Sequence, residues 1–114
     1  MDIKQLQQQI KEFCTTRDWD QFHNAKELAI GMSTEANELL EVFRFIKETD
    51  IENIVSQKKE HVEDELMDVL FFVLRFAQVY DVNIEEAFTR KMKKNNTHYP
   101  VDVVKGKNKK YNEY

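Results

Sequence analysis

The chain has 114 residues, which is the length of one domain. Its balance of 33% charged and 41% hydrophobic residues is typical of a soluble globular protein, and its net charge of −4 argues against nucleic-acid binding. The longest apolar run is too short to cross a membrane. A single cysteine, Cys14, excludes an internal disulfide, and the N-terminus has no signal-peptide pattern, so we expect a cytoplasmic protein.

Only two Gly and one Pro occur, and apolar residues recur at helical spacing, so the sequence predicts an all-α fold, a four-helix bundle. Asn24 and Asn83 are predicted N-caps, because each has Glu three residues later. The helices are expected at residues 2–17, 24–48, 58–80 and 83–97, with a connection at 51–57 that has room for a helical turn. We expect residues 1–100 to form one domain and residues 101–114 to be a basic tail, extended or disordered by itself.

Two acidic motifs each place two carboxylates three residues apart, Glu35 with Glu38 and Glu65 with Asp68. Residues at this spacing share one face of a helix. Glu35 falls in the middle of an apolar face, and Asp68 stands at the start of the apolar run 69–74. Acids at helical spacing often form a solvated face, but buried carboxylates are costly unless they are paired or bind metal. Because short connections favour antiparallel neighbours, we expect the four carboxylates to converge between the second and third helices.

A site made only of carboxylates suits Mg²⁺, Mn²⁺ or Ca²⁺. Mg²⁺ usually keeps positions open for water and for substrate phosphates, so the predicted reaction is attack of water on a phosphorus atom. On the fourth helix, Lys91 and Asn95 share a face with Ala87 and could contact phosphate or sugar. The alternative for Lys91 is that its side chain extends from the edge of the core into solvent.

The segment from Arg17 to His23 is aromatic and polar and interrupts the helical period, so we expect a loop there. Trp19, Phe22 and His23 could form a wall against a base, since aromatic rings stack on base faces. The simpler alternative is a hydrophobic plug under the loop, with His23 as a structural histidine.

These features together resemble the all-α nucleoside triphosphate pyrophosphohydrolases of the MazG type, and within them the dCTP pyrophosphatase-like branch. The resemblance spans residues 17–100. It rests on the segment from Arg17 to His23, on the two acidic motifs with Glu41, and on Lys91-Met-x-x-Asn95-x-x-x-Tyr99-Pro100.

The resemblance implies a fold, a cofactor and a reaction. It implies Mg²⁺, with Mn²⁺ as a substitute, held by Glu35, Glu38, Glu65 and Asp68. It implies hydrolysis between the α and β phosphates of a nucleoside triphosphate, which gives a monophosphate and pyrophosphate. Glu38 and Glu41 are both candidates for the general base.

The resemblance also implies substrate contacts. Residues near the base are Trp19, His23, Phe45 and Phe72, and residues near the phosphates or sugar are Lys91, Asn95 and Tyr99. Phe45 and Phe72 stand where dCTP-specific relatives carry Trp and Tyr, so the substrate is left open between dCTP and modified nucleotides. Such relatives assemble as dimers or as dimers of dimers, so we expect a homodimer or a tetramer.

The third predicted helix points to an oligomer independently, because it is apolar on every side from Val69 to Leu74. The narrow apolar stripes of the first and fourth helices cover only part of it. A symmetric contact with a second copy through the second and third helices would bury the rest.

Two other functions are weighed against the pyrophosphohydrolase. A non-catalytic helical partner-binding module accounts for the apolar helix but not for the position of Glu35. A phosphoribosyl-ATP pyrophosphohydrolase stays open within the enzyme class. A di-iron carboxylate protein needs two Glu-x-x-His motifs, and Glu41 and Asp68 stand where those histidines would be.

Overall fold

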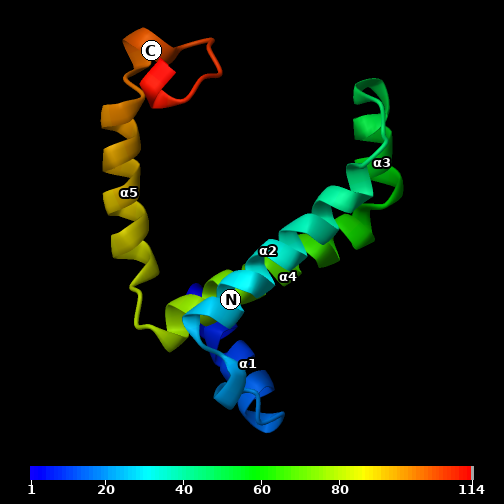
Figure 1. Ribbon diagram of the computed structural model, residues 1–114, viewed down its shortest axis with the longest axis vertical. Helices are drawn as coiled ribbons and strands as arrows, with labels where there is room; N and C mark the ends of the chain where they lie inside the picture. Colours follow the sequence, from blue (N-terminus) through cyan, green and yellow to red (C-terminus); the bar gives the residue numbers. More distant parts are fainter. Residues whose placement is uncertain (114) are drawn as a thin grey trace. The chain divides into compact units, whose positions relative to one another are not determined.

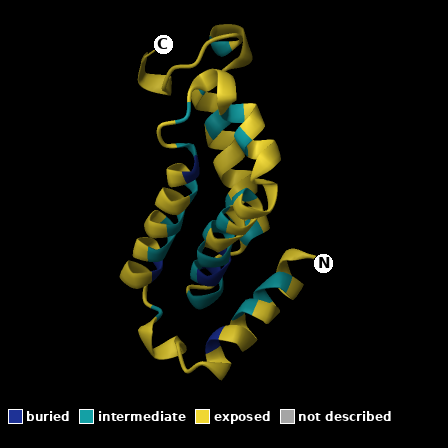
Figure 2. Cartoon of the chain, turned by 90° about the vertical axis from the view of Figure 1, so that its right-hand side faces the viewer, coloured by how far each residue is buried: buried dark blue, intermediate teal, exposed yellow. Residues whose placement is uncertain are grey.

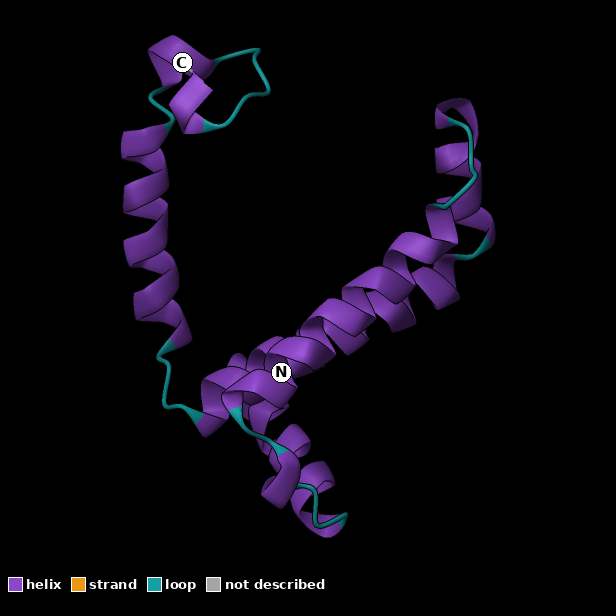
Figure 3. Cartoon of the chain, in the orientation of Figure 1, coloured by secondary structure: helices purple, strands orange, loops and turns teal. Residues whose placement is uncertain are grey.

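The structure is a computed structural model that describes residues 1–113. This part of the chain contains helices and turns but no strand, as Figure 3 shows, so the predicted all-α class is confirmed. The α-helices are α1 (Ile3–Thr16), α2 (Ala25–Phe43), α3 (Ile51–Gln57), α4 (Lys59–Val79), α5 (Ile84–His98) and α6 (Val101–Val104). Three short 3-10 helices are η1 (Asp20–Phe22), η2 (Glu48–Asp50) and η3 (Tyr111–Glu113). None of the described helices is both long enough and apolar enough to cross a membrane.

The chain divides into two compact units, Met1–Asp81 and Val82–Tyr114. The first contains α1 to α4, and the second contains α5, α6 and η3. The expected division into a domain of residues 1–100 and a tail stays a prediction.

The four long helices expected from the sequence are α1, α2, α4 and α5. Both predicted N-caps are confirmed, since the Asn24 side chain accepts from the Glu27 N–H at 2.9 Å and that of Asn83 accepts from the Glu86 N–H at 3.1 Å. A third N-cap, at Asp2, forms a complete capping box with Gln5.

Three boundaries differ from the prediction. Helix α2 ends at Phe43 rather than near residue 48, because Arg44 is extended and Phe45 takes a left-handed conformation with φ of 67°. The predicted connection at 51–57 is the regular helix α3. The tail is not wholly extended, because α6 and η3 form in it. The Tyr111 ring stacks on the His98 ring, with 4.2 Å between the ring centroids, and so connects the tail to the end of α5.

Helices α2 and α4 lie side by side and run antiparallel (Figure 1). At one end the Tyr80 hydroxyl, just after α4, accepts from the N–H of Ala25, the first residue of α2, at 2.6 Å. Helix α1 packs against α4 through two amides. Gln7 Nε2 donates to the Leu74 carbonyl at 3.0 Å, and Gln78 Nε2 donates to the Gln7 carbonyl at 2.8 Å.

The buried core of residues 1–113 is small, and Figure 2 shows few fully buried positions. Its apolar members are Cys14, Leu28, Val42, Leu74 and Ala77. Leu28 and Val42 belong to the apolar face on which Glu35 was expected, so that face is confirmed as the inner side of α2. On α4, however, Leu66 stays 48% exposed and Val73 43% exposed, so this chain alone does not cover every side of the helix.

Candidate metal centre

Four carboxylates meet between α2 and α4. Glu35, Glu38, Glu65 and Asp68 each offer one oxygen, and these oxygens all lie within 4.8 Å of one another. The expected convergence is therefore observed, because the antiparallel helices bring the two acidic motifs to the same level. Glu35 and Glu65 are half-buried, whereas Glu38 and Asp68 are exposed, so the cluster has an inner side and a side open to solvent.

On the inner side of the cluster, two buried carboxylate oxygens have no hydrogen bond from residues 1–113 to offset the cost of their burial. Glu35 Oε2 and Glu65 Oε2 are buried and have no hydrogen-bond partner within the described residues. Burial, followed by the hydrogen bond and charge of Glu38, raises the pKa of Glu35 to about 7. Burial and the charge of Glu38 also raise the pKa of Glu65, and His61, whose Nδ1 lies 3.8 Å from Glu65 Oε1, opposes this. A divalent cation fits this site, since it would neutralise the repulsion and bind oxygens that nothing else satisfies.

Phe72 packs beside the cluster. Gly31 lies one turn before Glu35 on α2, and Phe72 lies one turn after Asp68 on α4, about 6 Å along each axis. A Cβ placed on Gly31 would lie 2.6 Å from Phe72 Cδ1 and 2.7 Å from Cζ, which is closer than side chains approach one another. The Phe72 ring can occupy this position only because residue 31 is a glycine and has no side chain.

A row of aromatic rings leads from Phe72 to His23. Successive ring centroids lie 5.3 Å apart from Phe72 to Phe71, 5.9 Å from Phe71 to Phe13, 5.5 Å from Phe13 to Trp19 and 6.5 Å from Trp19 to His23. All four contacts are edge-to-face, an arrangement that aromatic pairs prefer. Three of the four residues predicted near the base thus lie on one connected row.

Phe45 and Glu41 lie toward the end of α2. Phe45 is 89% exposed and lies outside the aromatic row, with the Arg44 guanidinium 4.7 Å from its ring centre. Glu41 is exposed and pairs with Arg44 at 3.5 Å. It stands one turn after Glu38 but is not one of the four clustered carboxylates.

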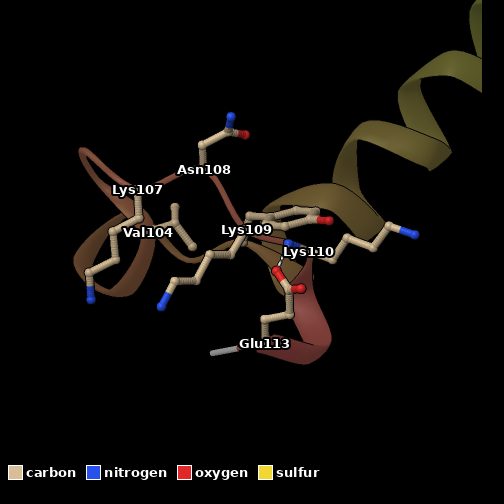
Figure 4. Close-up of a pocket in the computed structure, with 7 residues that line it drawn as sticks. Val104, Lys107, Asn108, Lys109, Lys110 and Glu113 are labelled. Carbon is tan, nitrogen blue, oxygen red and sulfur yellow. Dashed lines mark hydrogen bonds between the residues drawn. The ribbon is translucent and has the colours of Figure 1, made fainter.

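The residues predicted near the phosphates belong to the second unit. Lys91 is exposed on α5, and Asn95 is half-buried with its Nδ2 3.7 Å from Met92 Sδ. Tyr99 closes α5, where its N–H donates to the Asn95 carbonyl at 2.8 Å. A surface hollow of about 560 Å³ in the C-terminal segment is lined by Tyr99, Val104, Lys107, Asn108, Lys109, Lys110 and Glu113 (Figure 4).

Sequence reasoning missed Gly31 and Arg75. Nothing in the sequence marks Gly31, because its effect depends on a ring from another helix. Arg75 did leave a signal, since it is the only charged residue between Val69 and Val79, and a lone charge in an apolar helix indicates a buried pair.

The sequence is similar to those of known proteins. It is 32% identical over 114 residues to dCTP pyrophosphatase 1 of Mus musculus and 31% identical over 116 residues to dCTP pyrophosphatase 1 of Homo sapiens. Each match covers 98% of this chain and 65% of the relative, so the chain spans slightly less than two thirds of the length of these curated relatives.

A solved structure and a family model agree with these matches. The fold is similar to the crystal structure of a pyrophosphatase from Archaeoglobus fulgidus, with a TM-score of 0.80 and 38% identity over 85% of this chain and 91% of that one. The model of the MazG-like family matches residues 30–114, a range that includes both acidic motifs and Lys91. The resemblance inferred from those motifs is thereby confirmed, and the chain belongs to the MazG-like family.

Proposed function

We propose that the chain is an Mg²⁺-dependent nucleotide pyrophosphohydrolase that converts a nucleoside or deoxynucleoside triphosphate into a monophosphate and pyrophosphate. The observation that carries the proposal is the four-carboxylate cluster, whose two buried oxygens have no partner within residues 1–113. The similarity to dCTP pyrophosphatases and to an archaeal pyrophosphatase supports the reaction class.

Mg²⁺, or Mn²⁺ in its place, would be held by Glu35, Glu38, Glu65 and Asp68. When bound, the metal supplies stabilisation of the attacking and leaving oxygens. The half-buried Glu35 and Glu65 form the inner side of the site, and the exposed Glu38 and Asp68 leave an open side for substrate phosphates.

The general base is either Glu38 or Glu41. Glu38 lies within the cluster, so Glu38→Gln is expected to weaken metal binding and turnover together. Glu41 lies outside it, so a base role would appear as loss of kcat in Glu41→Gln with metal affinity unchanged. Measuring metal affinity and kcat separately in both variants assigns the role.

The residues proposed to contact the substrate form two groups. Trp19, His23, Phe45 and Phe72 are proposed to contact the base, and Lys91, Asn95 and Tyr99 to contact the phosphates or the sugar. The aromatic row supports Trp19, His23 and Phe72, because aromatic rings stack on the face of any base. The similarity to dCTP pyrophosphatases makes dCTP and modified nucleotides the substrates to test first.

The deciding experiment is a panel of nucleotides incubated with and without Mg²⁺ and scored by product identity. We expect monophosphate and pyrophosphate, and no turnover after chelation. Asp68→Asn should abolish turnover, whereas Glu63→Gln, an exposed acid on the same helix and outside the cluster, should not. Nucleoside diphosphate and orthophosphate as primary products would contradict the proposal, and turnover of phosphoribosyl-ATP alone would favour that alternative.

The functional protein is proposed to be a homodimer or a dimer of dimers in the cytoplasm, without nucleic-acid partners. The exposed Leu66 and Val73 support this assembly, because they are seven residues apart and so lie on one side of α4. A second copy would cover this side. Sedimentation of the parent and of Val73→Lys tests the contact, and a monomeric, active parent at micromolar concentration would contradict it.

A further inference from the structure

Helix α4 carries a buried charge, Arg75, which is only 4% exposed. A buried guanidinium requires partners for its N–H groups. Its Nε donates to His23 Nδ1 at 2.9 Å, Nη1 donates to Gln78 Oε1 at 2.8 Å, and Nη2 donates to Asp20 Oδ1 at 2.5 Å. Each of the three nitrogens of the guanidinium is therefore engaged.

The partners of Arg75 are themselves held in place. Asp20 also accepts from the Thr15 hydroxyl at 3.0 Å, and Gln78 donates to the Gln7 carbonyl at 2.8 Å. The hydrogen bond from Thr15, together with the hydrogen bond and charge of Arg75, keeps the pKa of Asp20 below its ordinary value, so this carboxylate stays ionised. The network joins α1, η1 and α4. Its hydrogen bonds hold the guanidinium in a single orientation.

This orientation determines where His23 carries its proton. An arginine side chain donates hydrogen bonds and accepts none, so His23 Nδ1 is the acceptor and carries no hydrogen. A neutral imidazole has one N–H, which must then be on Nε2. Burial and the charge of Arg75 lower the pKa of His23, with Asp20 acting weakly in the opposite direction, so the ring is neutral at pH 7.

We propose that Arg75 is a positioning residue that fixes His23 as a hydrogen-bond donor through Nε2, directed at an acceptor atom of a bound nucleobase. The acceptor is a carbonyl oxygen or an unprotonated ring nitrogen, because a donor on the ligand would face another donor. The ligand part of this proposal rests on the proposed function, whereas the tautomer of His23 does not. The position of His23 at the end of the aromatic row, in edge-on contact with Trp19, places the donor next to rings suited to a base.

The tautomer can be measured directly in the full, metal-free chain. Long-range ¹H–¹⁵N correlation spectra of the histidine rings should show an unprotonated Nδ1 and a protonated Nε2 for His23, with titration below the ordinary histidine range. His61 and His98 serve as internal references, because Arg75 contacts neither. A protonated Nδ1 in the parent would overturn the inference.

Two variants test the role of the network. Arg75→Met removes the donor, so His23 should titrate nearer its ordinary pKa and populate both tautomers. Asp20→Asn removes a neighbouring negative charge from a residue at the surface, so the pKa of His23 should fall further. A single Nε2–H tautomer of His23, unchanged in a folded Arg75→Met, overturns the inference. If that variant does not fold, the protonation of Nδ1 in the parent decides it.

The donor function is tested by comparing substitutions at His23 in the nucleotide assay. His23→Phe keeps a ring but removes the donor, so KM should rise by about 10- to 100-fold with a smaller change in kcat, as for loss of one buried hydrogen bond. His23→Gln keeps an N–H donor at a similar reach and should recover part of the loss. If the parent has no nucleotide activity, the proposed function fails while the tautomer result stands. An active parent in which His23→Phe has an unchanged KM overturns the donor role alone.

Discussion

The ring of Phe72 on α4 occupies the space that a side chain at Gly31 of α2 would need. A Cβ at position 31 would stand 2.6 Å from Phe72 Cδ1. The two residues lie one turn from the acidic motifs of their helices, so the close approach of α2 and α4 at this level also sets the separation of the carboxylates.

Gly31→Ala should destabilise the protein, although alanine is the better helix former. The gain in helix propensity is about 1 kcal/mol, whereas overpacking a fitted contact costs about 1–3 kcal/mol, so we expect a net loss of about 1 kcal/mol. Urea denaturation measures it. The double variant Gly31→Ala with Phe72→Leu should recover most of the loss, and a Gly31→Ala protein more stable than the parent would show that the ring moves freely.

Mg²⁺ should stabilise the parent and not the cluster variants. Binding to the native state alone adds about 2.7 kcal/mol at a ligand concentration of 100 times Kd. Thermal unfolding with and without Mg²⁺ should therefore differ for the parent and for Glu63→Gln, and should coincide for Glu38→Gln and Asp68→Asn. Equal stabilisation of all four proteins would mean that the metal binds elsewhere.

The metal-free protein should lose stability as the pH rises from about 4.5 to about 7. Glu35 has its pKa raised to about 7 from the ordinary 4.5, and Glu65 is raised as well, so the native state binds more protons than the unfolded state in this range. Protonation therefore favours folding, and ionisation opposes it. Denaturation at several pH values measures the slope, and saturating Mg²⁺ should reduce it because the cation compensates the charges.

Phe45→Gly should stabilise the fold and impair the proposed activity. Phe45 holds φ of 67°, which costs a residue with a Cβ about 1–2 kcal/mol that glycine avoids, while its ring is 89% exposed. We expect a gain of about 1 kcal/mol in the free energy of unfolding and a higher KM for nucleotide. Asp81, with φ of 53° and outside the predicted site, provides the matched control as Asp81→Gly. An unchanged KM would remove Phe45 from the substrate site.

Lys91→Ala should weaken catalysis by about 10- to 100-fold, the effect of losing one charge-assisted hydrogen bond. Helix content should not change, because alanine has the highest helix propensity. Lys94→Ala, another exposed lysine of α5, is the control. If kcat and KM of Lys91→Ala match those of the parent, the phosphate role of Lys91 is wrong.

The positions of α2 and α4 could be predicted because their apolar periodicity and Asn caps act locally along the chain. The convergence of Glu35 and Asp68 followed from the expectation that these two helices run antiparallel, although the connection between them is longer than expected and contains α3. The end of α2 could not be predicted, since Ile46 continues the apolar period and phenylalanine rarely takes the left-handed conformation that Phe45 adopts.

The partners of Arg75 were also beyond the sequence. Its position in an apolar helix indicated burial, but Asp20 and His23 precede it by more than 50 residues and meet it only in the folded chain. The local sequence pattern thus predicts that Arg75 needs a partner, whereas the identity of the partner depends on tertiary packing.

Cys14 can report local unfolding of the protein, because its thiol is exposed only when α1 separates from the core. Its side chain is fully buried, and burial raises the pKa of the thiol, so an alkylating or disulfide reagent cannot react while α1 is packed. As the only cysteine, it yields a single labelling signal whose rate follows the fraction of molecules that open. A ligand that binds the closed protein slows this labelling, so thiol chemistry at one end of α1 can register occupancy of a site on α2 and α4 without any assay of turnover.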